Sequence, residues 1–461
     1  MLIARFRTVS PLVLAMVAAC GSGHERTTAS GSTPEASARD GGAERTLAVL
    51  ARQAVDVDED TAAAAIDALR GAGPAGLAAL LAEHREDVVR LRTVPLSGDR
   101  DQLDALREEP ALLRLRAAID HVAAQRDAFA SELYWYTDLE AARAESDRSG
   151  RPILSLRLLG RLDEEASCAN SRFFRWLLYP SPIVREALAA YVLHWSSERP
   201  APHVTIDMGD GRTIERTVTG NSIHYVLDAS GRVIDAIAGL HTPTDFADCL
   251  RRALAIAAQC GVRTADRACL ARAHAQVLDE TRIAWEQIGA AVPSWETLLA
   301  ADIAPVDAPD AVMAMPLTVG KMAIEMPLLD LIAPTPSIDR TTLALPWGEV
   351  ARATRPASYD QTFSEGARAL ERLKTGAIDD AALLATTYAR TIEDSARNRF
   401  TLDRRIHAWL AVADLANDFS SFNERVYAEL FLTPASDPWL GLRAEGDWDV
   451  LEVTTSTGTR N

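Results

Sequence analysis

Residues 219–231 read TGNSIHYVLDASG, and residues 232–239 continue with RVIDAIAG. Ile223 to Leu227 and Val233 to Ile237 are short runs of residues that favour β-strands. The four residues DASG between them include several that favour turns. Two such runs joined by a short polar turn predict an antiparallel hairpin, so a β-sheet is expected at the centre of the chain.

The segments around this hairpin predict the rest of the sheet and the helices that cover it. Upstream, an amphipathic helix at 139–149 is stopped by Gly150 and Pro152, and the apolar run Ile153 to Leu159 predicts a buried strand. In chain order we then expect a helix from Cys168 to Leu178, a helix at 183–190, a strand at 191–195, a polar and turn-rich excursion around Asp210 and Gly211, and a closing helix at 245–259. A parallel pair joined by helices and followed by an antiparallel hairpin predicts a small mixed sheet.

With this order of elements, residues 132–260 resemble the thioredoxin superfamily. The entry at 139–159 is similar to that of secreted thioredoxin-like proteins, and 219–231 aligns without gaps to the family's strand before its final hairpin. The resemblance implies a thioredoxin-like domain with a redox site at the start of the helix that begins near Cys168.

Two positions depart from the pattern of this family. The family has Cys-x-x-Cys at its redox site, whereas Cys168-Ala-Asn-Ser171 has serine in the second place. The family also has a cis-proline opposite that site, and the matching residue here is Ser222. A cis bond before a residue other than proline costs about 3 kcal/mol, so we expect a trans peptide at Ser222.

Cys168 is the candidate catalytic residue, with Ser171 as its partner. A thiolate at a helix N-terminus is stabilised by free backbone N–H groups, and Ser171 could donate a hydrogen bond to it. A Cys-x-x-Ser motif cannot release a mixed disulfide by itself. Two functions therefore stay open: a binding or scaffolding role on a degenerate thioredoxin-like fold, or a monothiol oxidoreductase or client-holding protein that uses Cys168.

The first residues resemble a bacterial lipoprotein signal. Arg5 and Arg7 precede an apolar run at 9–19, which is shorter than the ~20 residues that span a bilayer. The run ends in Val-Ala-Ala-Cys20-Gly21, which resembles the lipobox. The resemblance implies a signal peptide at 1–19, a lipid on Cys20 and an envelope location, and Gly21 favours the outer membrane.

Composition limits the partners. The formal net charge is −17 and Lys321 and Lys374 are the only lysines, so neither phosphate backbones nor anionic lipid faces are expected to bind. The membrane partner is therefore the lipid anchor alone, and the other expected partners are protein clients or a thiol. No cofactor or nucleic acid is expected.

The remaining cysteines and histidines give one further candidate site. Cys260 and Cys269 flank a turn at Gly261 and are a candidate disulfide, which requires Cα atoms about 4.4–6.8 Å apart. His194 and His224 fall on expected strands, but no histidine pair has the spacing of a helical or strand metal site, so none is predicted.

Composition and periodicity divide the chain into segments and predict an α+β multidomain fold, with helical regions before and after the central domain. The segments are a flexible linker at 20–43, a helical region at 44–131, the central domain at 132–260, a helical segment at 262–301, a proline-rich packed segment at 302–346 and a helical C-terminal region at 347–461.

Overall fold

The computed structural model describes residues 34–94, 100–217, 220–289, 347–354, 363–376, 381–412, 418–438 and 440. Cys20, the lipobox, Thr219 and the proline-rich segment at 302–346 lie outside these ranges. The chain divides into two units, Met1–Arg45 and Thr46–Asn461. No helix in the described ranges is long and apolar enough to cross a membrane.

The N-terminal part is helical, as the periodicity indicates. Its helices are α1 (Pro34–Gln53), α2 (Glu59–Gly71), α3 (Pro74–Glu83), α4 (Arg85–Arg92), α5 (Arg100–Glu108), α6 (Pro110–Ala123) and α7 (Ala128–Ser131). Helix α1 begins inside the linker expected at 20–43, so that expectation is wrong for 34–43. Pro34 at the first helical position and the alanines, glutamate and arginine after it favour a helix, a signal hidden by the low apolar content.

Close packing fixes the α2–α3 corner. A Cβ atom on Gly76 would lie 1.9 Å from Leu69 O, so only glycine fits where α3 crosses α2. Helix α2 starts at Asp58, whose side chain accepts a hydrogen bond from Thr61 N.

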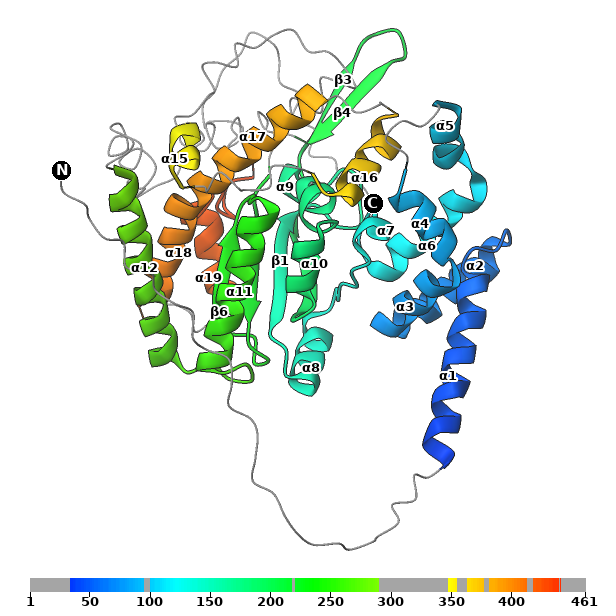
Figure 1. Ribbon diagram of the computed structural model, residues 1–461, viewed down its shortest axis with the longest axis horizontal. Coiled ribbons are helices and arrows are strands. Elements are labelled where there is room, and N and C mark those ends of the chain that lie inside the picture. The colour runs from blue at the N-terminus through cyan, green and yellow to red at the C-terminus, as the bar shows by residue number, and fades with distance from the viewer. Residues whose placement is uncertain are drawn as a thin grey trace, which may run out of the picture. The chain divides into compact units, whose positions relative to one another are not determined.

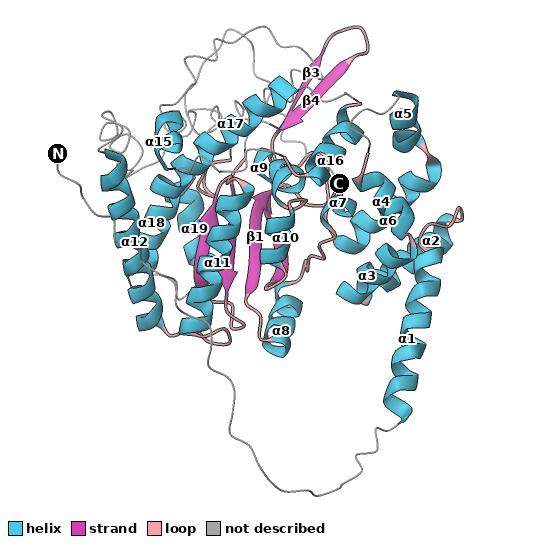
Figure 2. Cartoon of the chain, viewed as in Figure 1, coloured by secondary structure: helices cyan, strands magenta, loops and turns pink. Residues whose placement is uncertain are grey.

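The central sheet has four strands in the order β2-β1-β5-β6: β1 (Ile153–Leu159), β2 (Val192–Arg199), β5 (Ser222–Leu227) and β6 (Val233–Ala238). Strands β1 and β2 are parallel, and β5 is antiparallel to both β1 and β6. The predicted small mixed sheet and the α+β class are therefore confirmed (Figure 2).

The excursion between β2 and β5 is the main correction within this region. It was expected to be turn-rich, but β3 (His203–Asp207) and β4 (Thr213–Thr217) form a separate two-stranded sheet, the upper green hairpin in Figure 1. Asp207 Oδ1 accepts from Gly209 N in the turn. The sequence indicates only the turn, although Val204, Thr205 and Ile206 on β3 and Thr213 and Ile214 on β4 are β-branched residues that favour strands.

Helices from the same region cover one face of the sheet. They are α9 (Ala169–Phe173), the π-helical turn η1 (Phe174–Leu178) and α10 (Pro182–Leu188), which connect β1 to β2, and α11 (Pro243–Cys260). Helix α8 (Leu139–Ser149) precedes β1 and packs against β1 and β2. The face is identified by His224 of β5, whose ring lies 4.7 Å from that of Phe174 and 4.8 Å from that of Phe246.

The C-terminal helices pack around the sheet region, and one of them covers the other face of the sheet. They are α12 (Arg267–Gly289), α15 (Trp347–Thr354), α16 (Glu365–Thr375), α17 (Ala381–Asn398), η2 (Arg399–Asp403), α18 (Arg404–Leu410), α19 (Phe419–Arg425) and η3 (Val426–Leu430). Tyr225 follows His224 and so points to the opposite face, where its ring lies 5.0 Å from that of Phe419. Helices α17 and α18 form one continuous helical stretch, because the π-helical turn η2 joins them.

Two side chains attach the C-terminal helices to the sheet region. Tyr225 is fully buried and its hydroxyl donates to Asn423 Oδ1 at 3.0 Å. Asn398 donates to Leu240 O at 2.7 Å, and a Cβ on Gly239 would lie 2.7 Å from Asn398 Nδ2. These contacts join residues that are about 150–200 positions apart in the sequence.

We expect Tyr225→Ala to lower the free energy of unfolding by about 3–5 kcal/mol, because it removes a buried ring between sheet and helices. Tyr225→Phe keeps the ring and removes only the hydrogen bond, so it should cost about 1–3 kcal/mol. Urea unfolding measures both. A loss below about 1 kcal/mol for the alanine variant would contradict the packing described for this face.

Candidate functional site

The structure brings Cys168 and Ser222 together. Cys168 is the N-cap of α9, and its Sγ lies 3.0 Å from Ser222 Oγ at the start of β5. The two segments approach so closely that a Cβ on Gly220 would lie 2.8 Å from Ala169 Cβ. The described residues contain no cis peptide bond, so Ser222 is preceded by a trans peptide.

The Cys168 thiol is not accessible to solvent. Its residue is 0% exposed, and the Ser222 hydroxyl is the hydrogen-bond partner of its sulfur. The loop that leads into β5 is covered by the C-terminal segment, since Tyr427 donates to Asn221 O at 3.5 Å and Asn221 donates to Thr433 Oγ1 at 3.4 Å. Arg199 fastens this cover by donating to Thr433 O at 2.7 Å.

The Ser171 hydroxyl does not donate a hydrogen bond to the sulfur of Cys168, although the sequence suggested that it could. Its hydroxyl lies 2.6 Å from Ser167 Oγ and 2.9 Å from Cys168 O. Arg175, which is almost fully buried, donates to Ser167 Oγ at 3.0 Å and to Glu165 O at 3.2 Å. Ser171 therefore belongs to the hydrogen bonds that shape the turn before α9.

The acidic loop before Cys168 faces cations. Glu165 forms an ion pair with Lys374 of α16 at 2.6 Å, and Lys374 also lies 2.7 Å from Asp127. Burial would raise the pKa of Glu165, but Lys374 and Arg175 outweigh it and lower that pKa to about 2. Glu165 is therefore a fixed negative charge that connects this loop to α16.

His194 and His224 do not converge on a common site. His194 Nδ1 lies 2.8 Å from Ser155 Oγ, and His224 Nε2 lies 2.9 Å from the hydroxyl of Tyr179. Burial lowers the pKa of each histidine to about 3, with Arg157 adding to the effect at His194 and His241 at His224. Both are neutral core histidines at pH 7.

The other cysteines are either paired or buried. Cys260 and Cys269 form a disulfide, with Cα atoms 5.5 Å apart. Cys249 is free but buried in α11, and burial raises its pKa to about 12. Neither arrangement places a second thiol at Cys168.

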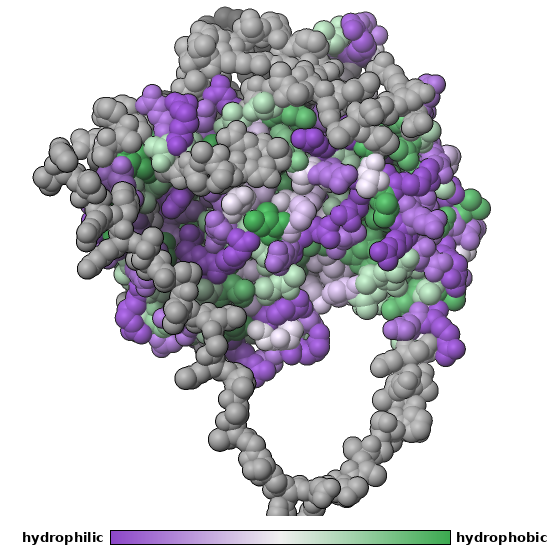
Figure 3. Space-filling view, viewed as in Figure 1, coloured by the Kyte–Doolittle hydropathy of each residue, from purple (hydrophilic) through white to green (hydrophobic). Residues whose placement is uncertain are grey.

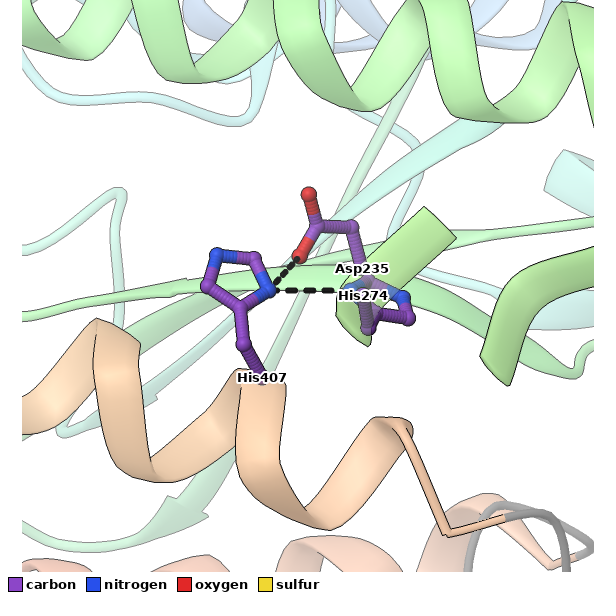
Figure 4. Close-up of side chains that lie close together, drawn as sticks. All are labelled: Asp235, His274 and His407. Carbon is purple, nitrogen blue, oxygen red and sulfur yellow. Dashed lines mark hydrogen bonds and ion pairs between the residues drawn. The ribbon is translucent and has the colours of Figure 1, made fainter. Parts of the chain in front are cut away.

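A cluster that the sequence did not reveal lies between β6 and the C-terminal helices. Asp235 of β6, His274 of α12 and His407 of α18 point toward one another (Figure 4). His274 Nδ1 lies 2.9 Å from His407 Nδ1, and His407 Nδ1 lies 3.7 Å from Asp235 Oδ1. The two histidines are 133 positions apart, so no local spacing could indicate that they meet.

An open groove lies at the surface between the N-terminal helices and the sheet region. It has a volume of about 640 Å³, and its lining includes Pro74, Leu77, Tyr134, Tyr136 and Arg185. The rings of Tyr134 and Tyr136 meet edge to face at 5.2 Å. On the face drawn in Figure 3, polar side chains surround small apolar areas.

Comparison with known proteins does not assign the chain. No protein-family model matches it, and neither the curated proteins nor the solved structures include a match. The class of the protein therefore has to be argued from its own geometry.

We expect neither free thiol in the described ranges to react with a thiol reagent in the folded Cys20→Ala protein, because Cys168 and Cys249 are both buried. Labelling followed by mass spectrometry should find two reactive thiols after unfolding and four when a reductant is added. Rapid labelling of Cys168 in the folded protein, compared with Cys168→Ser as control, would show that its sulfur is accessible.

Stability should fall on acidification because His224 is held neutral. Its folded pKa of about 3 lies below the ordinary 6.5, so the unfolded chain takes up a proton first as the pH falls. The contribution of neutral His224 to the free energy of unfolding is complete above pH 6.5 and is lost as the pH falls toward 3. Between pH 7 and 5, His224→Gln should therefore lose about 2 kcal/mol less than the wild type. Exposed His121→Gln is the control, and equal losses in all three proteins would refute the assignment.

Proposed function

We propose that this protein is an envelope lipoprotein whose central thioredoxin-like domain has a binding or scaffolding role and no dithiol redox activity. The observation that carries the proposal is the complete burial of Cys168 against Ser222. A redox thiol must reach the disulfide of its client, and a sulfur enclosed by protein cannot do so.

The sheet topology supports the thioredoxin-like part of this proposal. Strand order β2-β1-β5-β6, with β1 parallel to β2 and β5 antiparallel to β1, is the arrangement that the resemblance implies for 132–260. Cys168 begins the helical connection after β1, and Ser222 lies opposite it at the start of β5. The hairpin β3–β4 forms the connection between β2 and β5.

The surroundings of Cys168 argue against a second thiol. Ser171 contacts Ser167 and the Cys168 carbonyl, and an alcohol does not carry out thiol exchange at neutral pH. The C-terminal segment at 427–433 also takes up the hydrogen-bonding groups of Asn221, next to Ser222. An extended client would need these groups free in order to lie beside Cys168.

The groove that contains Tyr134 and Tyr136 is the surface that we propose for a protein partner. Tyrosines with an apolar ring and a polar hydroxyl are enriched where proteins bind each other, and Leu77 and Pro74 add an apolar wall. Cys168 is not among the residues that line the groove, so partner binding through the groove would not depend on the thiol.

A photo-crosslinking residue at Tyr136 tests this role in membranes of producing cells. We expect an adduct of defined mass that is absent when the same residue replaces the exposed Val412. Tyr134→Ala should weaken the adduct, and Cys168→Ser should leave it unchanged. An adduct that disappears in Cys168→Ser would contradict the proposal.

The alternative function is a monothiol oxidoreductase or client-holding protein. The position of Cys168 at a helix start beside Ser222 favours it. Its signature would be a mixed disulfide with a client that accumulates and disappears in Cys168→Ala. Such a species, found after acid trapping of thiols, would replace the binding role with this alternative.

The lipid anchor has its own test. Cys20→Ala should leave the precursor uncut and unlipidated, because the thiol of that residue accepts the lipid in the lipobox that the sequence resembles. Globomycin should block processing of the wild type in the same way. Intact mass spectrometry reads both effects, and normal processing of the variant would disprove the anchor.

A further inference from the structure

We propose that Asp235, His274 and His407 bind one divalent transition-metal ion of the zinc class, which fastens the C-terminal helices to strand β6. Imidazole nitrogens and a carboxylate are the ligands that zinc and its neighbours in the first transition row accept. The three side chains come from three elements, and each is at most 1% exposed (Figure 4).

The tautomer of His274 leaves its Nδ1 atom able to bind a metal ion. His274 Nε2 lies 2.8 Å from Ile234 O, and a carbonyl can only accept, so Nε2 carries the proton. The Nδ1 atom of a neutral ring then presents a lone pair toward His407. In a metal-bound histidine, the ring nitrogen that does not bind the metal usually donates its N–H to a carboxylate, a backbone carbonyl or water.

His407 is prepared for the same role. Its side chain is buried and lies against both of the other proposed ligands. Its Nδ1 faces both His274 Nδ1 and Asp235, while Nε2 has no hydrogen-bond partner in the described part of the chain. Without a cation, the single proton on His407 Nδ1 would be donated to His274 Nδ1, and Asp235 Oδ1 at 3.7 Å would receive no hydrogen bond from the ring.

Asp235 is a buried carboxylate whose cationic neighbour, Arg252, forms only a long ion pair with it. Its Oδ1 accepts from Ala236 N, but within the described residues Oδ2 has no hydrogen-bond partner. Arg252 Nε lies 3.8 Å from Oδ2, which is beyond hydrogen-bond distance. A buried carboxylate with an unpartnered oxygen is costly, and a divalent ion at the three facing donors would offset that cost.

The distances fit an ion of this size. Metal–nitrogen bonds of about 2.0–2.1 Å in a tetrahedron put neighbouring donors about 3.3 Å apart. The observed separations of 2.9 and 3.7 Å bracket that value, and all three donors lie within 4.8 Å of one another. The unpartnered Oδ2 of Asp235 can serve as the fourth donor, since zinc carboxylates also bind through both oxygens.

A neighbouring cluster is the weaker candidate. His241, Cys249 and Asp403 also gather in the core, but Arg252 is hydrogen-bonded to Cys249 there, whereas the same arginine reaches Asp235 only at 3.8 Å. The Asp235 cluster has no cation within hydrogen-bond distance among the described residues. We therefore assign the ion to Asp235, His274 and His407.

The burial of all three ligands makes this ion structural. No substrate could reach it, and its ligands join β6, α12 and α18, which are separated by long stretches of sequence. The ion would hold the C-terminal helices on the sheet independently of the Cys168 site, so this proposal stands whether or not the proposed function is correct.

The test is Zn²⁺ binding by the full chain carrying Cys20→Ala, after chelator treatment, at pH 7. We expect one equivalent per chain by calorimetry and elemental analysis, and a rise in Tm when Zn²⁺ is added. His274→Gln, His407→Gln and Asp235→Asn should each weaken binding by at least ~100-fold, since loss of outer-shell partners alone already costs 10–100-fold. Exposed His121→Gln should bind as the wild type does.

A second measurement separates this site from the cysteine cluster. Cys249→Ala should keep its equivalent of Zn²⁺, and the Co²⁺-loaded protein should lack thiolate-to-metal charge-transfer absorption. Folding of each variant is checked by circular dichroism, and the wild-type stoichiometry decides the question if a ligand variant does not fold. Absence of wild-type binding at micromolar Zn²⁺, or full binding by folded His407→Gln, would overturn the proposal.

Discussion

The burial of β5 on both faces is the constraint on which the rest of the structure depends. All six residues of β5 are buried, so each face of the sheet has to be covered by apolar side chains. Helices α9, α10 and α11 cover one face and come from the sequence that surrounds the strands. The other face is covered from the C-terminal region, through Phe419, Phe422 and Asn423 around Tyr225.

This dependence also explains the state of Cys168. The C-terminal segment that follows α19 lies over the loop before Ser222 because α19 is held against Tyr225. The same packing that completes the core therefore encloses the position where a thioredoxin-like protein would expose its reactive sulfur.

The sequence predicted those elements whose signals are local. The strand at 153–159, the hairpin at 223–237 and the closing helix each contain their own apolar period and stop residues, and all are present. The proximity of Cys168 to Ser222 followed from the resemblance, but the burial of Cys168 depends on Tyr427 and Thr433, more than 200 residues away. Contacts between residues so far apart produce no periodic pattern in the sequence.

Polar residues in the core were the least predictable. His407 lies on a helix with ordinary amphipathic spacing, and nothing in that spacing distinguishes it from a solvated histidine. Its meeting with His274 results from the crossing of α12 and α18 over the edge of the sheet. The hairpin β3–β4 was missed for a different reason, since its strands are only five residues long and the alternation of Val204 and Ile206 is surrounded by charged and turn-forming residues.

The residues that cover one face of β5 lie far downstream in the sequence, so they are synthesised long after the strand itself. Strand β6 ends at Ala238, but α19 begins only at Phe419. At a synthesis rate of about 5–20 residues per second, the residues between β6 and α19 take roughly 10–40 s to make, and one apolar face of the sheet stays exposed during that time. During that interval, while residues 239–419 are being synthesised, the nascent chain exposes an apolar surface, so this is when holding chaperones are needed most.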